Sequence, residues 1–169
     1  GSDTMDATSV GGYSEDYLDI MGYEIESGRN LLYSDMASRQ KVALIGDFVA
    51  TELYGSAESA VGSTIKNNGD AYTVVGVVER QTEDDSDYED GCDDDFVWIP
   101  YSRAVKLSRN ANITNYTFTS WNTDNTDACT EALESFLYEH LMNEDLYDVM
   151  AMSSLLDSLN EQVAMMSMM

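Results

Sequence analysis

Residues 41–55 read KVALIGDFVATELYG, and the rest of the chain is arranged around them. Lys41 to Ile45 form an apolar run of strand length, which Gly46 interrupts. Asp47 can then cap a helix from Phe48 to Tyr54, and Gly55 is suited to end it. We therefore predict a buried strand followed directly by a short helix.

A hairpin follows at residues 63–78, which read STIKNNGDAYTVVGVV. The Asn68-Gly69 pair supplies the positive φ angles that a type I′ turn requires. The sequence predicts two antiparallel strands joined across Asn67–Asp70, with Val74 or Val75 buried.

Several motifs carry a family resemblance through their order, although none of them is diagnostic alone. They are Tyr17 within residues 14–18, the Gly28-Arg29 pair, and the segments 42–46, 50–55, 61–65, 72–78 and 96–100, the last of which ends in Pro100. Together they resemble the extracytoplasmic core domain of MacB-like (FtsX-like) ABC-transporter permeases. The resemblance runs roughly from Ser9 to Asn160.

Composition limits the classes of function. The 169 residues are 43% hydrophobic, which is enough for one domain or two small lobes with a core. Eight Lys and Arg against 32 Asp and Glu give a formal charge of -24, so nucleic acid and anionic lipid headgroups would be repelled. The acidic surface is interpreted first as a solvated surface. Its alternative roles are attraction of cationic peptides, of a basic partner domain or of divalent cations.

No apolar segment approaches the ~20 residues that span a bilayer, and no signal peptide opens the chain. Gly1-Ser2 is typical of a cloning remnant, so we expect an excised domain of a longer protein. Cys92 and Cys129 are too few for a disulfide scaffold and lack metal-ligand spacing. They either form one bridge or remain separate thiols.

The N-terminal third predicts short elements. Ala7–Val10 can form an edge strand ending at Gly11-Gly12. A helix over Glu15–Met21, capped by Ser14 and ended by Gly22, would present Tyr17, Leu18 and Met21 to the core. Tyr23–Glu26 alternates as a half-exposed strand does, and residues 31–41 are expected to form a loop.

Residues 83–95 hold nine carboxylates, so mutual repulsion is expected to keep this loop extended. A calcium site is the functional alternative, because hard cations bind clustered oxygen ligands. An EF-hand starting at Asp85 would need Gly at Asp90 and Glu at Phe96, however, so no metal ligand is assigned.

The second half predicts a β-α-β unit. Phe96–Pro100 reads as a strand, and Ser102 can cap a helix to Leu107 that packs through Ala104, Val105 and Leu107. A strand over Tyr116–Trp121, a helix from about Ala128 to Leu141 and a strand over Leu146–Met150 follow. From Ser153 or Ser154 onward apolar residues keep helical spacing, which predicts a helix. The resemblance implies that this helix is a stalk entering the membrane, whereas periodicity alone fits an ordinary core helix equally well.

The sequence offers few candidates for catalytic or ligand-binding residues. His140 lies on the apolar face of its helix, and Cys129 on the same face is expected to be a buried small residue. No phosphate loop, nucleophile elbow or zinc motif occurs. We therefore assign no catalytic, cofactor-binding or metal-binding residue.

We predict an α+β fold of two small lobes. An inserted strand-helix-hairpin lobe spans residues 12–81, an acidic loop spans 82–95, and a partial membrane-proximal β-α-β lobe with a stalk helix spans 96–169, with residues 1–11 as its incoming strand. Their sheets should be antiparallel or mixed.

The resemblance implies a non-enzymatic domain on the extracytoplasmic face of the cell membrane, without a cofactor of its own. Its implied partners are the parent's transmembrane helices, a cytoplasmic ATPase subunit or domain, an extracytoplasmic protein or peptide substrate, and a second copy in a homodimer. The alternatives are a binding or sensory domain for a cationic peptide or protein, and a secreted enzyme that uses carboxylates.

Overall fold

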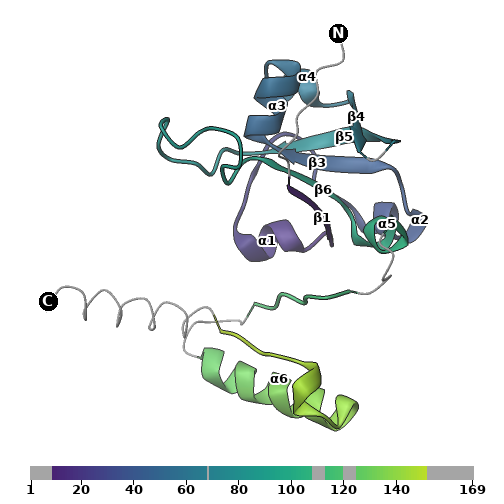
Figure 1. Ribbon diagram of the computed structural model, residues 1–169, viewed down its shortest axis with the longest axis vertical. Coiled ribbons are helices and arrows are strands. Elements are labelled where there is room, and N and C mark those ends of the chain that lie inside the picture. The colour runs from purple at the N-terminus through teal and green to yellow at the C-terminus, as the bar shows by residue number, and fades with distance from the viewer. Residues whose placement is uncertain (1–8, 68, 108–112, 120–124, 152–169) are drawn as a thin grey trace, which may run out of the picture. The chain divides into compact units, whose positions relative to one another are not determined.

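The computed structural model describes residues 9–67, 69–107, 113–119 and 125–151. The chain divides into two compact units, Gly1–Thr117 and Phe118–Met169 (Figure 1). The first unit contains a six-stranded mixed sheet with helices on both faces, and in the described part of the second unit a helix of 16 residues dominates. The α+β class is therefore confirmed.

The sheet of the first unit has the strand order β1-β6-β3-β5-β2, with β4 also paired to β5. The strands are β1 Ser9–Tyr13, β2 Ile25–Gly28, β3 Val42–Gly46, β4 Thr64–Asn67, β5 Asp70–Val78 and β6 Phe96–Pro100. β5 runs parallel to β3 and antiparallel to β2 and β4. Because β3 occupies one edge of β5, β2 and β4 share the other edge in succession.

The predicted strand-helix step is present. In β3, residues 43–46 are all buried, and helix α3, Asp47–Tyr54, follows without a gap. Gly55 ends α3 with φ +83°, as expected. The predicted cap is wrong, because Asp47 is already the first helical residue and the N-cap is Gly46.

The predicted hairpin is confirmed. Asn67 pairs with Asp70, and the antiparallel ladder continues to Thr64 and Thr73. Gly69 has φ +83°, a conformation that favours glycine. Val74 is fully buried on the adjoining part of β5.

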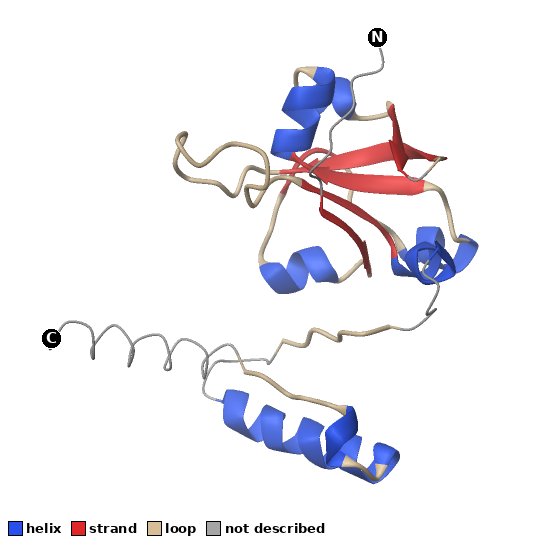
Figure 2. Ribbon diagram, viewed as in Figure 1, coloured by secondary structure: helices blue, strands red, loops and turns tan. Residues whose placement is uncertain are grey.

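Helices lie on both faces of the sheet (Figure 2), and an apolar cluster packs under each layer. On one face Ala43, Ile45, Val74 and Val97 lie under α3 and under α4, Ala57–Ala60. The other face is covered by α1, Tyr17–Met21, and α2, Tyr33–Ser38, through buried residues that include Leu18, Met36, Leu44, Phe96 and Trp98. Burial on both faces explains why β3 and β6 read as continuous apolar runs.

The N-terminal elements differ in detail from the prediction. β1 continues through Gly11-Gly12 to Tyr13, whereas Ala7 and Thr8 of the predicted strand lie outside the described residues. β2 begins two residues later than Tyr23. α1 begins at Tyr17 after an Asp16 N-cap rather than after Ser14, and Met21 on it is exposed.

Residues 31–41 were expected to form a loop but contain α2. The side chain of Asp35 accepts a hydrogen bond from Leu32 N–H at 3.0 Å and forms an ion pair with Arg29 at 2.8 Å. A carboxylate at the third helical position can stabilise a helix start in this way, although a leucine stands at the N-cap.

The expected division into lobes at 12–81 and 96–169 does not coincide with the two units. β6 pairs parallel to β1 and antiparallel to β3, so Phe96–Pro100 belongs to the sheet that contains β3 and β5. Helix α5, Tyr101–Leu107, follows it in the same unit. Ser102 lies inside α5 rather than capping it, and Leu107 is exposed rather than packed.

In the second unit the predicted helix is confirmed as α6, Thr126–Leu141, and a 3-10 turn follows at Glu144–Leu146. The expected β-α-β unit is not formed in the described residues, because segments 113–119 and 147–151 contain no strand. The stretch from Ser153 lies outside the described residues, as does Trp121.

Candidate functional site

The acidic segment 82–95 is the feature of the first unit with the highest density of charge, and its base is folded rather than extended. Asp94 is fully buried, and its carboxylate accepts hydrogen bonds from the backbone N–H of Gln81 at 2.7 Å and of Thr82 at 2.9 Å. Asp95 is also buried and accepts from Gly91 N–H at 2.9 Å. Two of the nine carboxylates therefore hold the base of the loop together by accepting hydrogen bonds from backbone N–H groups.

Tyr88 attaches the tip of this loop to α3. Its hydroxyl donates to Asp47 Oδ2 at 2.7 Å, and its ring meets Phe48 edge-on with centroids 5.1 Å apart. The Arg80 guanidinium lies 4.2 Å from the centre of the same ring. Burial, followed by the hydrogen bond to Asp47, raises the pKa of Tyr88 far above its ordinary value, so the phenol keeps its proton.

The remaining carboxylates of the loop face solvent: Glu83, Asp84, Asp85, Asp87, Glu89, Asp90 and Asp93. Asp85 forms an ion pair with Arg80 at 2.8 Å. Nearby, the pKa of Glu26 is raised by partial burial first, and then by the negative charges of Asp47 and Glu58. This end of the first unit is therefore an acidic surface.

The described residues of the acidic surface form no metal centre. Within the described residues no group of three or more His, Cys, Asp or Glu side chains is placed to hold a metal ion.

His140 and the cysteines are not brought together as a catalytic group. His140 is exposed, its Nδ1 lies 2.8 Å from Phe136 O, and its ring packs 4.1 Å from that of Phe136. Cys129 is exposed, so its expected burial is wrong, and Cys92 is half-buried. Both are free thiols in the structure. They belong to different units, so a bridge between them stays a prediction.

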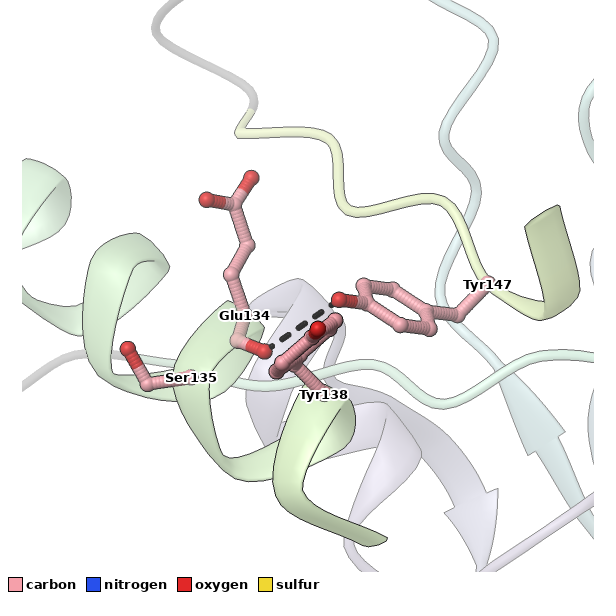
Figure 3. A pocket seen from close by; sticks show the side chains of 4 residues that line it. All are labelled: Glu134, Ser135, Tyr138 and Tyr147. Carbon is pink, nitrogen blue, oxygen red and sulfur yellow. Dashed lines mark hydrogen bonds between the residues drawn. The ribbon is translucent and has the colours of Figure 1, made fainter. Parts of the chain in front are cut away.

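A polar pocket of the second unit was missed by sequence reasoning. Figure 3 shows its lining, which consists of Glu134, Ser135 and Tyr138 of α6 and Tyr147 of the segment that follows. The Tyr147 hydroxyl donates to the backbone oxygen of Glu134 at 3.4 Å. The spacing of Glu134 and Tyr138 places them on one helix face, but nothing in the sequence places Tyr147 beside them.

None of the helices in the described residues has the length and apolar character to cross a bilayer.

The sequence model of the MacB-like periplasmic core domain family matches residues 1–136. The chain is 31% identical over 91 residues to the uncharacterized ABC transporter permease YvrN of Bacillus subtilis (strain 168), covering 54% of this chain and 22% of that protein. It is 28% identical over 97 residues to the macrolide export ATP-binding/permease protein MacB of Hahella chejuensis (strain KCTC 2396), covering 57% of this chain and 14% of that protein. The chain thus spans less than a quarter of the length of each of these two relatives.

Solved structures share the fold. The periplasmic region of MacB from Actinobacillus actinomycetemcomitans matches with a TM-score of 0.73 and 18% identity, over 95% of this chain and 69% of that one. The extracellular domain of the noncanonic ABC-type transporter YknZ from Gram-positive bacteria matches with a TM-score of 0.62 and 18% identity, over 84% of this chain and 69% of that one. Because the family match covers most of the 169 residues, the chain belongs to the MacB-like periplasmic core domain family of ABC-transporter permeases.

Proposed function

We propose that this domain lies on the extracytoplasmic face of the membrane and couples cytoplasmic ATP hydrolysis to an external partner or to substrate export. Family membership supports the transporter setting and, with it, a non-enzymatic role. ATP would be bound by a separate cytoplasmic subunit or domain of the parent.

The observation that carries the proposal is the attachment of α5 to the sheet. Arg103 Nη2 lies 3.1 Å from Asp70 Oδ2, and Lys41 Nζ lies 2.6 Å from Asp70 Oδ1. The Ser102 hydroxyl donates to Met36 O at 2.7 Å. These contacts join α5 to the hairpin, to the start of β3 and to α2.

The charges at this junction support one another. The hydrogen bond from Lys41 is the largest influence that lowers the pKa of Asp70, and Arg103 adds to it. The Arg103 side chain is only 14% exposed, so its guanidinium is held more firmly than a surface cation. α5 is the last described helix of the first unit before the chain passes to the second, so a force along the chain would reach the sheet through this junction.

The test uses the full-length parent with its ATPase in proteoliposomes. Arg103→Gln should loosen α5 and lower export several-fold while ATP hydrolysis continues, because hydrolysis would no longer be coupled to the outer unit. Lys106→Gln is the matched control, since it removes one positive charge from an exposed position of the same helix. Unchanged export by Arg103→Gln, with faster amide exchange of α5 shown in the same sample, would contradict the proposal.

We further propose that the parent works as a homodimer and engages an extracytoplasmic protein or peptide. Exposed apolar side chains of the second unit support this, among them Phe136 at 55% and Met142 at 77% exposure. Sedimentation of this chain against a version truncated after Leu159 tests self-association. If both are monomeric, the proposed dimer loses this support.

Recognition of a cationic peptide is the second candidate function, and the acidic surface around Tyr88 favours it. Binding by this surface should weaken steeply as salt screens the carboxylates. Titration of a basic peptide at low and high ionic strength, followed through the amide resonances of residues 82–95, separates the two roles, because a domain that only transmits motion would show no saturable shift of this loop at either salt concentration.

A further inference from the structure

The pocket on α6 brings a carboxylate and two aromatic rings to one place. Its volume is about 470 Å³, and its lining is Glu134, Ser135, Tyr138 and Tyr147 (Figure 3). The hydrogen bond of 3.4 Å from the Tyr147 hydroxyl to Glu134 O ties the segment after α6 to the helix. The two rings therefore come from different segments of the second unit and frame one opening.

The second unit carries charges of almost only one sign. Residues 118–169 contain ten Asp and Glu residues and no Lys or Arg. Glu134 is exposed, and no Lys or Arg of its own unit is available to neutralise it. His140 is the unit's one basic side chain, and it lies against Phe136. A cation that enters the pocket would therefore meet a carboxylate with few competitors.

The lining suits an organic cation. Tyrosine ring faces attract ammonium and guanidinium groups, and a neighbouring carboxylate adds Coulomb attraction and accepts their hydrogen bonds. A volume of about 470 Å³ falls within the ordinary range of small-ligand sites and exceeds the needs of a bare metal ion. The Ser135 hydroxyl offers a further acceptor.

We propose that this pocket binds a guanidinium or primary ammonium group, supplied either by a small free amine or by a basic side chain of a peptide. The site lies in the second unit and does not depend on the acidic loop of the first or on the transmission role. The proposed transmission of motion involves none of the residues that line this pocket.

The first experiment titrates the full 169-residue chain with N-acetyl-arginine amide and follows the tyrosine ring resonances by NMR. The rings of Tyr138 and Tyr147 should shift and saturate with a dissociation constant on the order of millimolar, since an open site gains modestly from each contact. N-acetyl-citrulline amide, which has nearly the same shape without the charge, should give no saturable shift.

A capped pentapeptide of four glycines around one arginine distinguishes the two sources. Binding at least about threefold tighter than that of the single amino-acid amide indicates a peptide side chain, because flanking backbone then contributes. Equal affinity indicates a free cation.

Variants test the placement. Glu134→Gln should weaken binding about two- to fivefold, the effect of losing one exposed charge contact, and Tyr138→Ala should weaken it by a similar factor. Glu139→Gln is the matched control, because it removes the same charge from an exposed position of α6 outside the pocket lining. Equal weakening by Glu139→Gln, or equal shifts with the citrulline compound, would overturn the proposal, as would the absence of any shift of the two rings at about ten times the expected dissociation constant.

Discussion

Replacement of Asp94 should destabilise the first unit although the residue sits in a run of carboxylates. Its side chain is fully buried and accepts two backbone hydrogen bonds, at 2.7 and 2.9 Å. Asp94→Ala would leave the N–H groups of Gln81 and Thr82 without this acceptor. Asp94→Asn would keep one carbonyl oxygen and lose the charge.

The magnitude follows from these contacts. A hydrogen bond to a charged acceptor contributes about 1.5–3 kcal/mol, and both donors belong to half-buried residues that water can partly reach. We expect Asp94→Ala to lower the free energy of unfolding by about 2–4 kcal/mol and Asp94→Asn by about 1–2 kcal/mol. Asp93→Asn, a neighbouring exposed residue with the same change in charge, should stay within about 0.5 kcal/mol.

The assay is urea unfolding at pH 7 combined with hydrogen exchange of the amides of β3, β5 and β6, because these amides report on the first unit alone. An effect of Asp93→Asn as large as that of Asp94→Asn would refute the reasoning, since it would assign stability to loop charge rather than to the buried hydrogen bonds. A stabilising Asp94→Asn would refute it as well.

Three further changes, one of them with a matched control, test other parts of the first unit. Glu26→Gln should raise the unfolding free energy at pH 7 by roughly 0.2–0.5 kcal/mol. The pKa of Glu26 is raised in the folded protein, so the Glu26 carboxyl contributes to stability below the ordinary carboxyl pKa, and this contribution is lost as pH rises through the folded value. The stability gained by Glu26→Gln at pH 7 should therefore vanish when unfolding is measured in acid. Gly28→Ala should cost about 2–3 kcal/mol by urea unfolding, since a Cβ there combines φ +83° with a backbone clash, whereas Gly55→Ala has the same φ in open space and should cost about 1 kcal/mol. Tyr88→Phe should cost about 1 kcal/mol through the lost bond to Asp47, and faster amide exchange in segment 83–91 would show it.

The secondary structure was predicted most accurately where backbone requirements and burial agree. The run at Val42–Gly46, the helix ended by Gly55 and the turn at Gly69 each combine an apolar pattern with a glycine at positive φ or a strand break. Such local signals survive folding because tertiary contacts reinforce them. The motif order carried the family resemblance, which the match to residues 1–136 confirms.

Prediction failed where a side-chain contact or a distant strand pairing decides the structure. The start of α2 depends on the Asp35 side chain, which accepts from Leu32 N–H and pairs with Arg29, and the leucine at the N-cap concealed this start. The pairing of β6 with both β1 and β3 joins segments more than 50 residues apart, so the lobe boundary could not be found from local composition.

The candidate site was harder still to predict. Repulsion among nine carboxylates suggested an extended loop, yet Asp94 turns inward to accept from two backbone N–H groups and Asp95 to accept from one. A count of charges gives the net charge of the loop, but it does not say in which direction each side chain points. The α6 pocket likewise depends on where Tyr147 returns to the helix, which periodicity does not encode.

Transmission across the membrane is tested most directly by an inter-copy distance measurement in the full-length parent. A spin label at Thr51→Cys, an exposed position of α3, would be introduced with Cys92 and Cys129 replaced by serine. Double electron–electron resonance is then recorded without nucleotide and after trapping with ATP and vanadate. We predict that the distance distribution between the two copies differs between these states. Identical distributions while ATP is hydrolysed, or no dipolar coupling between copies in either state, would contradict the proposed coupling.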